Sequence, residues 1–250
     1  MASRRYNPVM DLDGKVALVT GSAKRIGKAI ACQLANAGAD IALHYRNSQS
    51  EAQETGKEIA YLGGQVRLFQ ADLSEPDQIR SMFAAVSEQF GRLDVLVNNA
   101  SICGRTPIGD LTAEQWDKQF AVNARAAALC IRHAAPLMSD GGAIINIADV
   151  SAGSPWAGYP AYCASKAALV ALTKSAAKAL APKVRVNAVS PGAILWADDM
   201  PDGQKAKVLE HIPMKRQGKA QDVAAAVVFL AQQDYITGQE LRVDGGWKTG

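Results

Sequence analysis

Short apolar segments that alternate with longer helical ones are the feature of this sequence that most constrains its fold. The apolar segments are rich in β-branched residues and have almost no polar positions, which is typical of strands buried on both faces. Between them, apolar residues recur every three or four positions, the period of a one-sided helix. Strands are predicted at 15–20, 39–45, 65–70, 93–99, 143–148, 184–189 and 241–244, and helices at about 26–37, 50–62, 75–90, 112–135, 161–181 and 219–232.

Strands that are each followed by a helix predict an α/β fold, a doubly wound parallel sheet of about seven strands in a single domain. We expect residues 1–12 to be an N-terminal extension and residues 13–250 to form the domain. Ligands of such a fold bind outside the carboxyl ends of the strands. The irregular segment at about 191–218 is expected to be a lid over that site, the alternative being a surface insertion with no role.

Composition narrows the class of protein further. With 48% hydrophobic and 20% charged residues the chain reads as an ordinary soluble protein. A net charge of +3 with scattered basic residues predicts no nucleic-acid partner. No apolar run approaches the roughly 18 residues of a membrane span, and the first residues lack the apolar core of a signal peptide. We therefore expect a cytoplasmic protein with no membrane partner.

The cysteines carry no sign of a disulfide framework or a metal site. They show no paired spacing and have no histidine cluster beside them, so free thiols in a reducing compartment are the expectation. The four positions are Cys32, Cys103, Cys130 and Cys163.

The segment VALVTGSAKRIGKAIA leads from the first predicted strand into the first predicted helix, with Gly21 and Gly27 in the turn. Backbone N–H groups at a helix start hold phosphate oxygens, and glycine lets a phosphate approach closely. Arg25 takes the place of one glycine of the generic dinucleotide pattern. Because the turn follows the first strand, it predicts a pyrophosphate site rather than a tight turn alone.

The end of the second strand indicates which dinucleotide is bound. It reads HYRNS and has no acidic residue to accept the ribose 2′-hydroxyl. Arg46 and Ser48, with Lys24 or Arg25, would instead attract a 2′-phosphate. The sequence therefore predicts NADP(H), although solvated surface charges are the alternative interpretation of these residues.

Polar residues also follow the third and fourth strands. Asp72 in QADLS could accept a hydrogen bond from the adenine amino group, or it could simply cap a helix. The run Asn98, Asn99, Ala100 and Ser101 could line the adenosine and the nicotinamide ribose.

Tyr162 and Lys166 lie four residues apart in a helical segment, so they share one helix face. The unperturbed pKa of tyrosine is about 10, and a cation one turn away favours the phenolate. The same ammonium group could bind ribose hydroxyls. This spacing also arises by chance, but its place after the fifth strand, downstream of a cofactor turn, favours an acid–base pair.

These motifs together resemble the short-chain dehydrogenase/reductases, over residues 13–247. The resemblance is carried by TGSAKRIG, NNAS, FAVNARAA, YCASK, SPG at 190–192 and ITGQELRVDGG. It implies a Rossmann-like sheet of seven strands, a homotetramer and hydride transfer from a nicotinamide. It also implies that Tyr162 donates the proton, that Lys166 activates it, and that Asn123 holds a water linking Lys166 to solvent.

Asp149 departs from this family, most members of which have a serine there. A carboxylate opposes the negative charge that develops on a carbonyl oxygen. It suits a substrate that offers N–H donors, or a nitrogen protonated at a C=N bond. Ser151 could replace the missing hydroxyl.

Within the superfamily the pteridine reductases have this aspartate, and the chain resembles them in Arg25, LHY at 43–45, NNAS and DDMP at 198–201. The resemblance implies reduction of a pterin or folate substrate such as dihydrobiopterin or dihydrofolate, with a proton relay through Asp149, Tyr162 and Lys166.

Two positions differ from that group, and two other functions stay open. Cys103 stands where a phenylalanine stacks on the pterin, so the ring would have to come from Trp156, Trp196 or another aromatic residue. Ile194 stands where a hydroxyl residue often contacts the cofactor. The first alternative function is a carbonyl reductase acting on a ketone or a 3-oxoacyl thioester, and the second is a protein that senses NADP(H) without catalysis.

The expected site residues follow from these motifs and from the resemblance. The catalytic residues are Asp149, Tyr162, Lys166 and Asn123. The cofactor residues are Gly21, Arg25, Ile26, Gly27, His44, Tyr45, Arg46, Asn47, Ser48, Asp72, Leu73, Asn99, Ala100, Ser101, Tyr162, Lys166, Pro191, Gly192 and Ile194. The substrate residues are Arg25, Ser101, Cys103, Asp149, Tyr162 and Trp196.

Overall fold

The computed structural model describes residues 10–196 and 200–248. In this part of the chain seven strands form one sheet in the order β3-β2-β1-β4-β5-β6-β7, and every neighbouring pair is parallel. The predicted doubly wound α/β fold is confirmed. The strands are β1 Val16–Val19, β2 Asp40–Tyr45, β3 Val66–Gln70, β4 Leu93–Asn98, β5 Met138–Ile147, β6 Val184–Pro191 and β7 Glu240–Val243.

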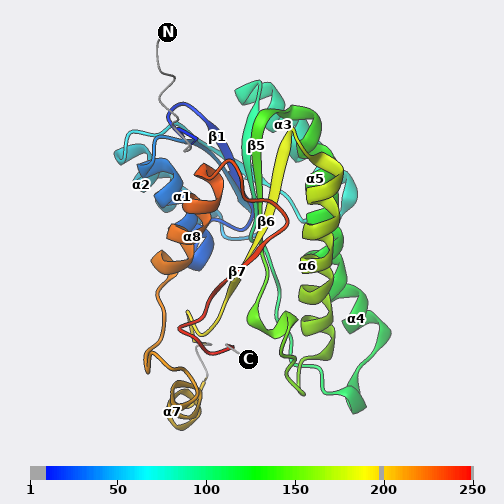
Figure 1. Cartoon of the computed structure of the whole chain (residues 1–250). Helices are drawn as coiled ribbons and strands as arrows, with labels where there is room; N and C mark the ends of the chain where they lie inside the picture. Colours follow the sequence, from blue (N-terminus) through cyan, green and yellow to red (C-terminus); the bar gives the residue numbers. More distant parts are fainter. Residues whose placement is uncertain (1–9, 197–199, 249–250) are drawn as a thin grey trace.

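Helices cover both faces of the sheet (Figure 1). One layer holds α1 Arg25–Asn36, α2 Gln49–Tyr61 and α8 Ala220–Gln232. The other holds α3 Pro76–Phe90, α4 Ala113–Phe120, α5 Ala126–Ala134 and α6 Pro160–Leu180. The helix α7 Asp202–Glu210 stands apart at the carboxyl edge. Short helical turns occupy η1 Ile108–Asp110, η2 Ala121–Arg125, η3 Ala135–Leu137 and η4 Val150–Ala152.

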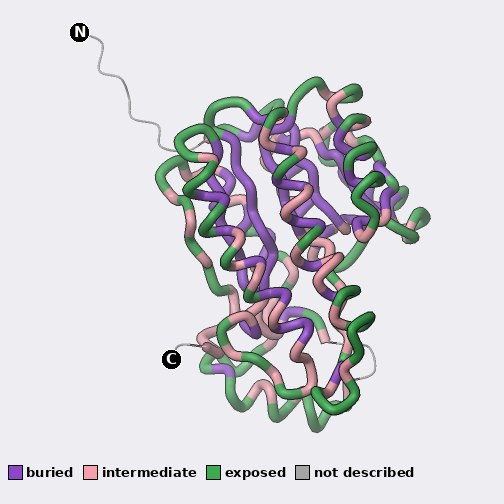
Figure 2. The backbone as a smooth tube through the Cα atoms, turned by 90° about the vertical axis from the view of Figure 1, so that its right-hand side faces the viewer, coloured by how far each residue is buried: buried purple, intermediate pink, exposed green. Residues whose placement is uncertain are grey.

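Burial of the strands explains why their sequences are so apolar. All residues of β1, β4 and β6 are buried, whereas the edge strands β3 and β7 are partly exposed. Figure 2 shows the buried residues concentrated along the central strands between exposed helix surfaces. The strand β5 starts at Met138, five residues before its predicted start. The prediction began late because the first half of the strand contains the polar run SDGG, which lacks the apolar pattern of a buried strand.

The helix predicted at about 112–135 is present as the continuous helical run of α4, η2 and α5, but the structure places a π turn, η2 at Ala121–Arg125, within it. The Thr112 side chain caps the start of α4 by accepting from the Gln115 backbone N–H, as expected for a helix N-terminus. Insertion of one residue into a helix shifts the face that follows it, and such π turns are frequent at functional sites. Here the turn carries Asn123.

The lid predicted at about 191–218 is in part regular, since it contains α7. Its two ends meet, because the Gly218 N–H donates to the Ala193 carbonyl at 3.0 Å. Residues 197–199, which include the aspartates of the DDMP motif, lie outside the described residues, as do residues 1–9 of the expected extension. The lid role, the extension and the homotetramer stay predictions. No helix among the described residues is long and apolar enough to cross a membrane.

His44, at the end of β2, braces the turn that follows β1. Its Nδ1 accepts from the Gly21 N–H at 2.9 Å, and its Nε2 lies 3.0 Å from the Ala71 carbonyl, to which it donates. The ring is buried, and burial lowers its pKa to about 4 even though the Ala71 carbonyl acts in the opposite direction. A neutral imidazole therefore connects the ends of three strands.

This brace makes the folded state sensitive to acid. The folded pKa of His44 lies below the unfolded value near 6.5, so the unfolded chain binds more protons between these values. The stability that the neutral His44 contributes to the folded state is complete above about pH 6.5, and it is lost as the pH falls toward 4. We expect the urea-unfolding free energy to drop by about 2 kcal/mol more, between about pH 7 and pH 5, in the wild type than in His44→Gln.

The exposed His211 supplies the matched control, because His211→Gln removes a histidine that is not buried. This variant should keep the wild-type pH dependence. An identical pH dependence in His44→Gln and the wild type would contradict the assignment of a neutral buried brace.

Candidate active site

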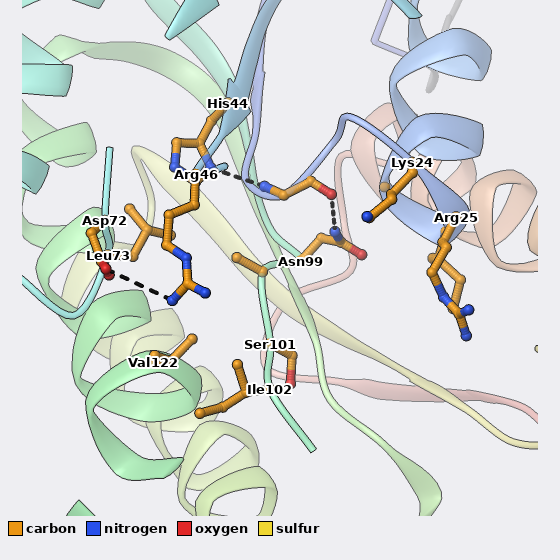
Figure 3. A pocket seen from close by; sticks show the side chains of 14 residues that line it. Lys24, Arg25, His44, Arg46, Asp72, Leu73, Asn99, Ser101, Ile102 and Val122 are labelled. Carbon is orange, nitrogen blue, oxygen red and sulfur yellow. Dashed lines mark hydrogen bonds and ion pairs between the residues drawn. The ribbon is translucent and has the colours of Figure 1, made fainter. Parts of the chain in front are cut away.

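A cavity of about 360 Å³ opens between β1 and β4, where the strand order reverses (Figure 3). Such switch points are where doubly wound sheets bind ligands. The cavity brings together eleven of the expected cofactor residues, contributed by the glycine turn and by the ends of β2, β3 and β4. The lining residues are Gly21, Lys24, Arg25, Ile26, Gly27, His44, Arg46, Asp72, Leu73, Asn99, Ala100, Ser101, Ile102 and Val122.

Gly21 and Gly27 are required for different physical reasons. Gly21 has a φ of +64°, a conformation that favours glycine. A Cβ on Gly27 would lie 2.2 Å from the Gly21 carbonyl oxygen and 2.6 Å from the Asn99 side-chain nitrogen. Gly27 is therefore needed for the packing of α1 against the turn, and no side chain caps the first turn of α1. The N–H groups there fit an anion such as a pyrophosphate.

Arg25, the first residue of α1, also has a left-handed backbone, with a φ of +57°. A side chain in this region costs on the order of 1–3 kcal/mol, which explains why glycine is common at this place in the pattern. The strained backbone brings the Arg25 side chain to the rim of the cavity (Figure 3).

Hydrogen bonds tie the end of β4 to the glycine turn. The Asn99 side chain donates to the carbonyl oxygens of Thr20 and Gly21, at 2.9 and 3.1 Å. The Thr20 hydroxyl accepts from the N–H groups of Asn99 and Ala100. Thr20 is not among the residues expected from the sequence, although a hydroxyl residue between a buried strand and the first glycine of the turn is a signal that would indicate it.

Two cations of the cavity already face acids. Arg46 Nη1 lies 3.7 Å from Asp72 Oδ2, and Lys24 Nζ lies 3.4 Å from Glu51 Oε1. Burial of Asp72 opposes its charge, but hydrogen bonds from Ser74, helped by Arg46, hold the pKa of the carboxyl below its usual value. Asp72 thus holds the turn at Ser74 and pairs with Arg46, but it does not cap a helix, because the N-cap position of α3 is Glu75.

Three of the expected cofactor residues at the end of β2 lie outside the cavity. Tyr45 is buried in the core between the sheet and α1. Asn47 lines a neighbouring hollow with Arg46 and Asp72, and Ser48 directly precedes α2.

The acid–base group forms where β5 ends and α6 begins. The Tyr162 hydroxyl donates to Asp149 Oδ2 at 2.9 Å, and Asp149 Oδ1 accepts from the Ser151 N–H at 2.7 Å. Lys166 Nζ donates to the Ile147 carbonyl at 2.8 Å and lies 5.8 Å from the centre of the Tyr162 ring. The structure thus brings together the three residues predicted for the proton relay.

The electrostatics of this group differ from the sequence-based expectation that Lys166 favours the phenolate. Burial, and next the Asp149 carboxylate, raise the pKa of Tyr162 well above its ordinary value. Burial lowers the pKa of the Lys166 ammonium to about 8, and Asp149 counteracts only part of this. Tyr162 is therefore protonated at neutral pH, which is the state of an acid that donates a proton.

Asn123 is buried on the π turn and fixes the chain after β4. Its Oδ1 accepts from the Ile102 N–H and its Nδ2 donates to the Ile102 carbonyl, both at 2.9 Å. The Ser101 hydroxyl donates to the same Oδ1, and Asn123 Nδ2 also donates to the Ser165 hydroxyl. The side chain therefore links this segment to α6, and its role toward a water stays a prediction.

The residues expected to contact substrate differ in accessibility. The Ser151 hydroxyl is fully buried and has no hydrogen-bond partner among the described residues, so it is closed off from a substrate. The Cys103 side chain is solvent-accessible, and its partial enclosure, with Asp149 nearby, raises the pKa of its thiol to about 11. Trp196 is half-buried beside the undescribed residues, whereas the Trp156 ring stacks on Tyr162.

Of the expected cofactor residues at and after the end of β6, only Ile194 borders a second cavity, of about 510 Å³. Ile194 lines it together with residues after β7. Gly192 packs so closely on Asp244 that a Cβ would approach it to 2.7 Å, and Pro191 ends the strand. In the described part of the chain no group of three or more metal-binding side chains occurs.

Comparison with known proteins is consistent with this geometry. Residues 21–248 match the model of the family described as enoyl-(acyl carrier protein) reductase. The chain is 40% identical over 241 residues to the 3-oxoacyl-(acyl-carrier-protein) reductase FabG of Staphylococcus aureus, which covers 93% of this chain and 97% of that protein.

Solved structures agree over the same length. A short chain dehydrogenase from Burkholderia cenocepacia in complex with NADP has a TM-score of 0.90 at 39% identity, covering 95% of this chain and 99% of that one. A blue fluorescent protein from a metagenomic library in complex with NADPH has a TM-score of 0.91 at 37% identity, covering 96% and 100%. The chain belongs to the short-chain dehydrogenase/reductase superfamily.

Proposed function

We propose that the protein is an NADPH-dependent reductase that acts on the keto group of a 3-oxoacyl thioester. The observation that carries this proposal is the Tyr162–Lys166 pair at the carboxyl end of β5, where Tyr162 contacts Asp149 and Lys166 contacts Ile147, in a chain similar over nearly its whole length to a 3-oxoacyl reductase. This substrate replaces the pterin favoured by the sequence motifs, since the relatives named above do not include a pteridine reductase.

NADP(H) is the cofactor that the cavity fits. The uncapped start of α1 suits the pyrophosphate, and the β2 end offers Arg46 without an acid on the same strand end. Arg46 and Lys24, both at the cavity, supply positive charge for a 2′-phosphate. Two similar structures hold NADP or NADPH, which supports the same choice.

When bound, the nicotinamide supplies the hydride. The chain supplies the proton and the orientation: Tyr162 donates from its hydroxyl to the substrate atom that becomes negative, and Lys166 sets the electrostatic surroundings of that hydroxyl. In the structure the hydroxyl proton of Tyr162 points at Asp149 Oδ2, so a substrate must compete with the carboxylate for it.

Asp149 favours a second candidate, the reduction of a C=N bond in a pterin. Its carboxylate would accept hydrogen bonds from N–H groups of such a ring, whereas it opposes a developing oxyanion. The buried Ser151 hydroxyl cannot take the place of a serine donor at the substrate. This carboxylate is the specific reason to test both substrate classes.

The cofactor assignment predicts a selective loss in Arg46→Ala. The variant should bind NADPH about tenfold more weakly, because a charge-assisted contact to the 2′-phosphate is removed, while NADH binding stays unchanged. Fluorescence titration with both nucleotides measures this. Arg67→Ala is the matched control, since Arg67 is exposed on β3 and outside the cavity. Equal losses for the two nucleotides would contradict a 2′-phosphate contact.

The acid–base assignment predicts that Tyr162→Phe lowers kcat about a hundred- to ten-thousand-fold and leaves NADPH affinity unchanged. NADPH oxidation should be followed with acetoacetyl thioester, dihydrobiopterin, dihydrofolate and a simple ketone. Tyr235→Phe serves as control, because Tyr235 is 97% exposed. Turnover of the pterins without the thioester would replace the proposed function by the second candidate, and turnover of no substrate would reject both.

Asp149→Asn separates the two chemistries. Asparagine keeps an oxygen for the Ser151 N–H and offers an N–H donor in place of the second carboxylate oxygen. We expect thioester reduction to be retained or to rise up to about tenfold in kcat/KM, and pterin reduction to fall at least about tenfold. Ser151→Ala should change neither activity, and a large loss in that variant would show that its hydroxyl reaches the substrate after all.

A further inference from the structure

The side chain of Trp156 stacks on the ring of Tyr162. The two ring centres are 6.2 Å apart and the planes are inclined by 21°, an offset-stacked arrangement. The edge of the Tyr159 ring meets Trp156 at 5.8 Å and 82°. Trp156 is thus held between two aromatic rings, one of which belongs to the proton donor.

Backbone contacts fix Trp156 at the start of α6. Its N–H donates to the Cys163 sulfur at 3.4 Å, and its carbonyl accepts from the Tyr159 N–H at 3.0 Å. The Tyr159 carbonyl in turn accepts from the Cys163 N–H at 2.9 Å. The loop that carries Trp156 is therefore attached to the same helical turn that carries Tyr162.

Tyr162 is held from three directions. Trp156 covers its ring, the Asp149 carboxylate accepts its hydroxyl proton, and Lys166 lies 5.8 Å from the ring centre. Only 7% of Tyr162 is exposed. Asp149 restrains the hydroxyl and Lys166 lies over the ring at a distance, whereas Trp156 stacks on the ring and so restrains its plane.

We propose that Trp156 is a positioning residue, which holds the Tyr162 phenol in the orientation for proton donation and keeps water from its ring. This inference rests on the proposed role of Tyr162 as the proton donor, for either substrate class. A displacement of about 1 Å in a reacting group can cost about a hundredfold in rate, so the stack controls a large part of the proton-transfer step.

Kinetics of the Trp156→Ala and Trp156→Phe variants test the proposal. The alanine variant should lose about ten- to a hundredfold in kcat, with KM and NADPH affinity little changed, because the ring of Tyr162 can then tilt. Phenylalanine retains a stacking face and should restore most of kcat. Trp116→Ala is the matched control: Trp116 stacks on Phe120 in α4, with centres 4.8 Å apart, and should have no effect on kcat.

A titration without substrate separates this proposal from the proposed function. The signal of Tyr162 in carbon-labelled tyrosine NMR can be assigned by its absence from Tyr162→Phe. Burial is the main cause of the raised pKa of Tyr162, so Trp156→Ala should lower that pKa toward the ordinary value of about 10, and Trp116→Ala should not. Because the protonated phenol is the donor, the fall of kcat at high pH should move to lower pH in the alanine variant.

The outcomes are distinct. A shifted titration with an inactive wild type would support the positioning role and reject the proposed substrates. An unchanged titration together with a raised KM would overturn the proposal, since Trp156 would then be a wall of the substrate site. An unchanged titration with unchanged kinetics would overturn it as well.

Discussion

The contact between Gly27 and the carbonyl of Gly21 is the constraint on which the carboxyl edge of the sheet depends. The contact leaves no space for a Cβ on Gly27. The start of α1 can therefore pack this closely on the turn after β1 only with glycine at this position. This close packing places the uncapped start of α1 beside the end of β4. Gly21 in the turn is then held by two hydrogen bonds, since its carbonyl accepts from the Asn99 side chain and its N–H donates to His44. A cavity at the switch point follows from this packing, because the chain leaves β1 and β4 in opposite directions.

The electrostatic properties of the group formed by Tyr162, Lys166 and Asp149 depend on burial. Tyr162, Lys166 and Asp149 lie within hydrogen-bonding or Coulombic range of one another, and removal of water raises the pKa of the phenol while it lowers that of the ammonium. A lysine that is charged in solution thus becomes a group that titrates near pH 8. The pair is prepared to give a proton away, which is the direction that a reduction requires.

Much of this arrangement was predictable from local patterns. Strand and helix periodicity locates most elements to within one or two residues, because the central β-branched runs are buried on both faces. The glycine turn and the Tyr162–Lys166 spacing are local too. The π turn at Asn123, the early start of β5 and the burial of Tyr45 were not predictable, since each depends on contacts with residues distant in the sequence. The stack of Trp156 on Tyr162 was not predictable from the sequence either.

The sequence by itself determined the doubly wound parallel sheet, and it singled out the glycine turn and the Tyr162–Lys166 pair as candidates for cofactor binding and proton transfer, because these follow from residue type and short spacing. The tertiary structure decided how those residues act. It made His44, which lines the cavity, a neutral brace of the glycine turn, enclosed the Ser151 hydroxyl and directed the Tyr162 proton to Asp149. Burial and cross-strand distance control these properties, and neither is a local feature of the chain.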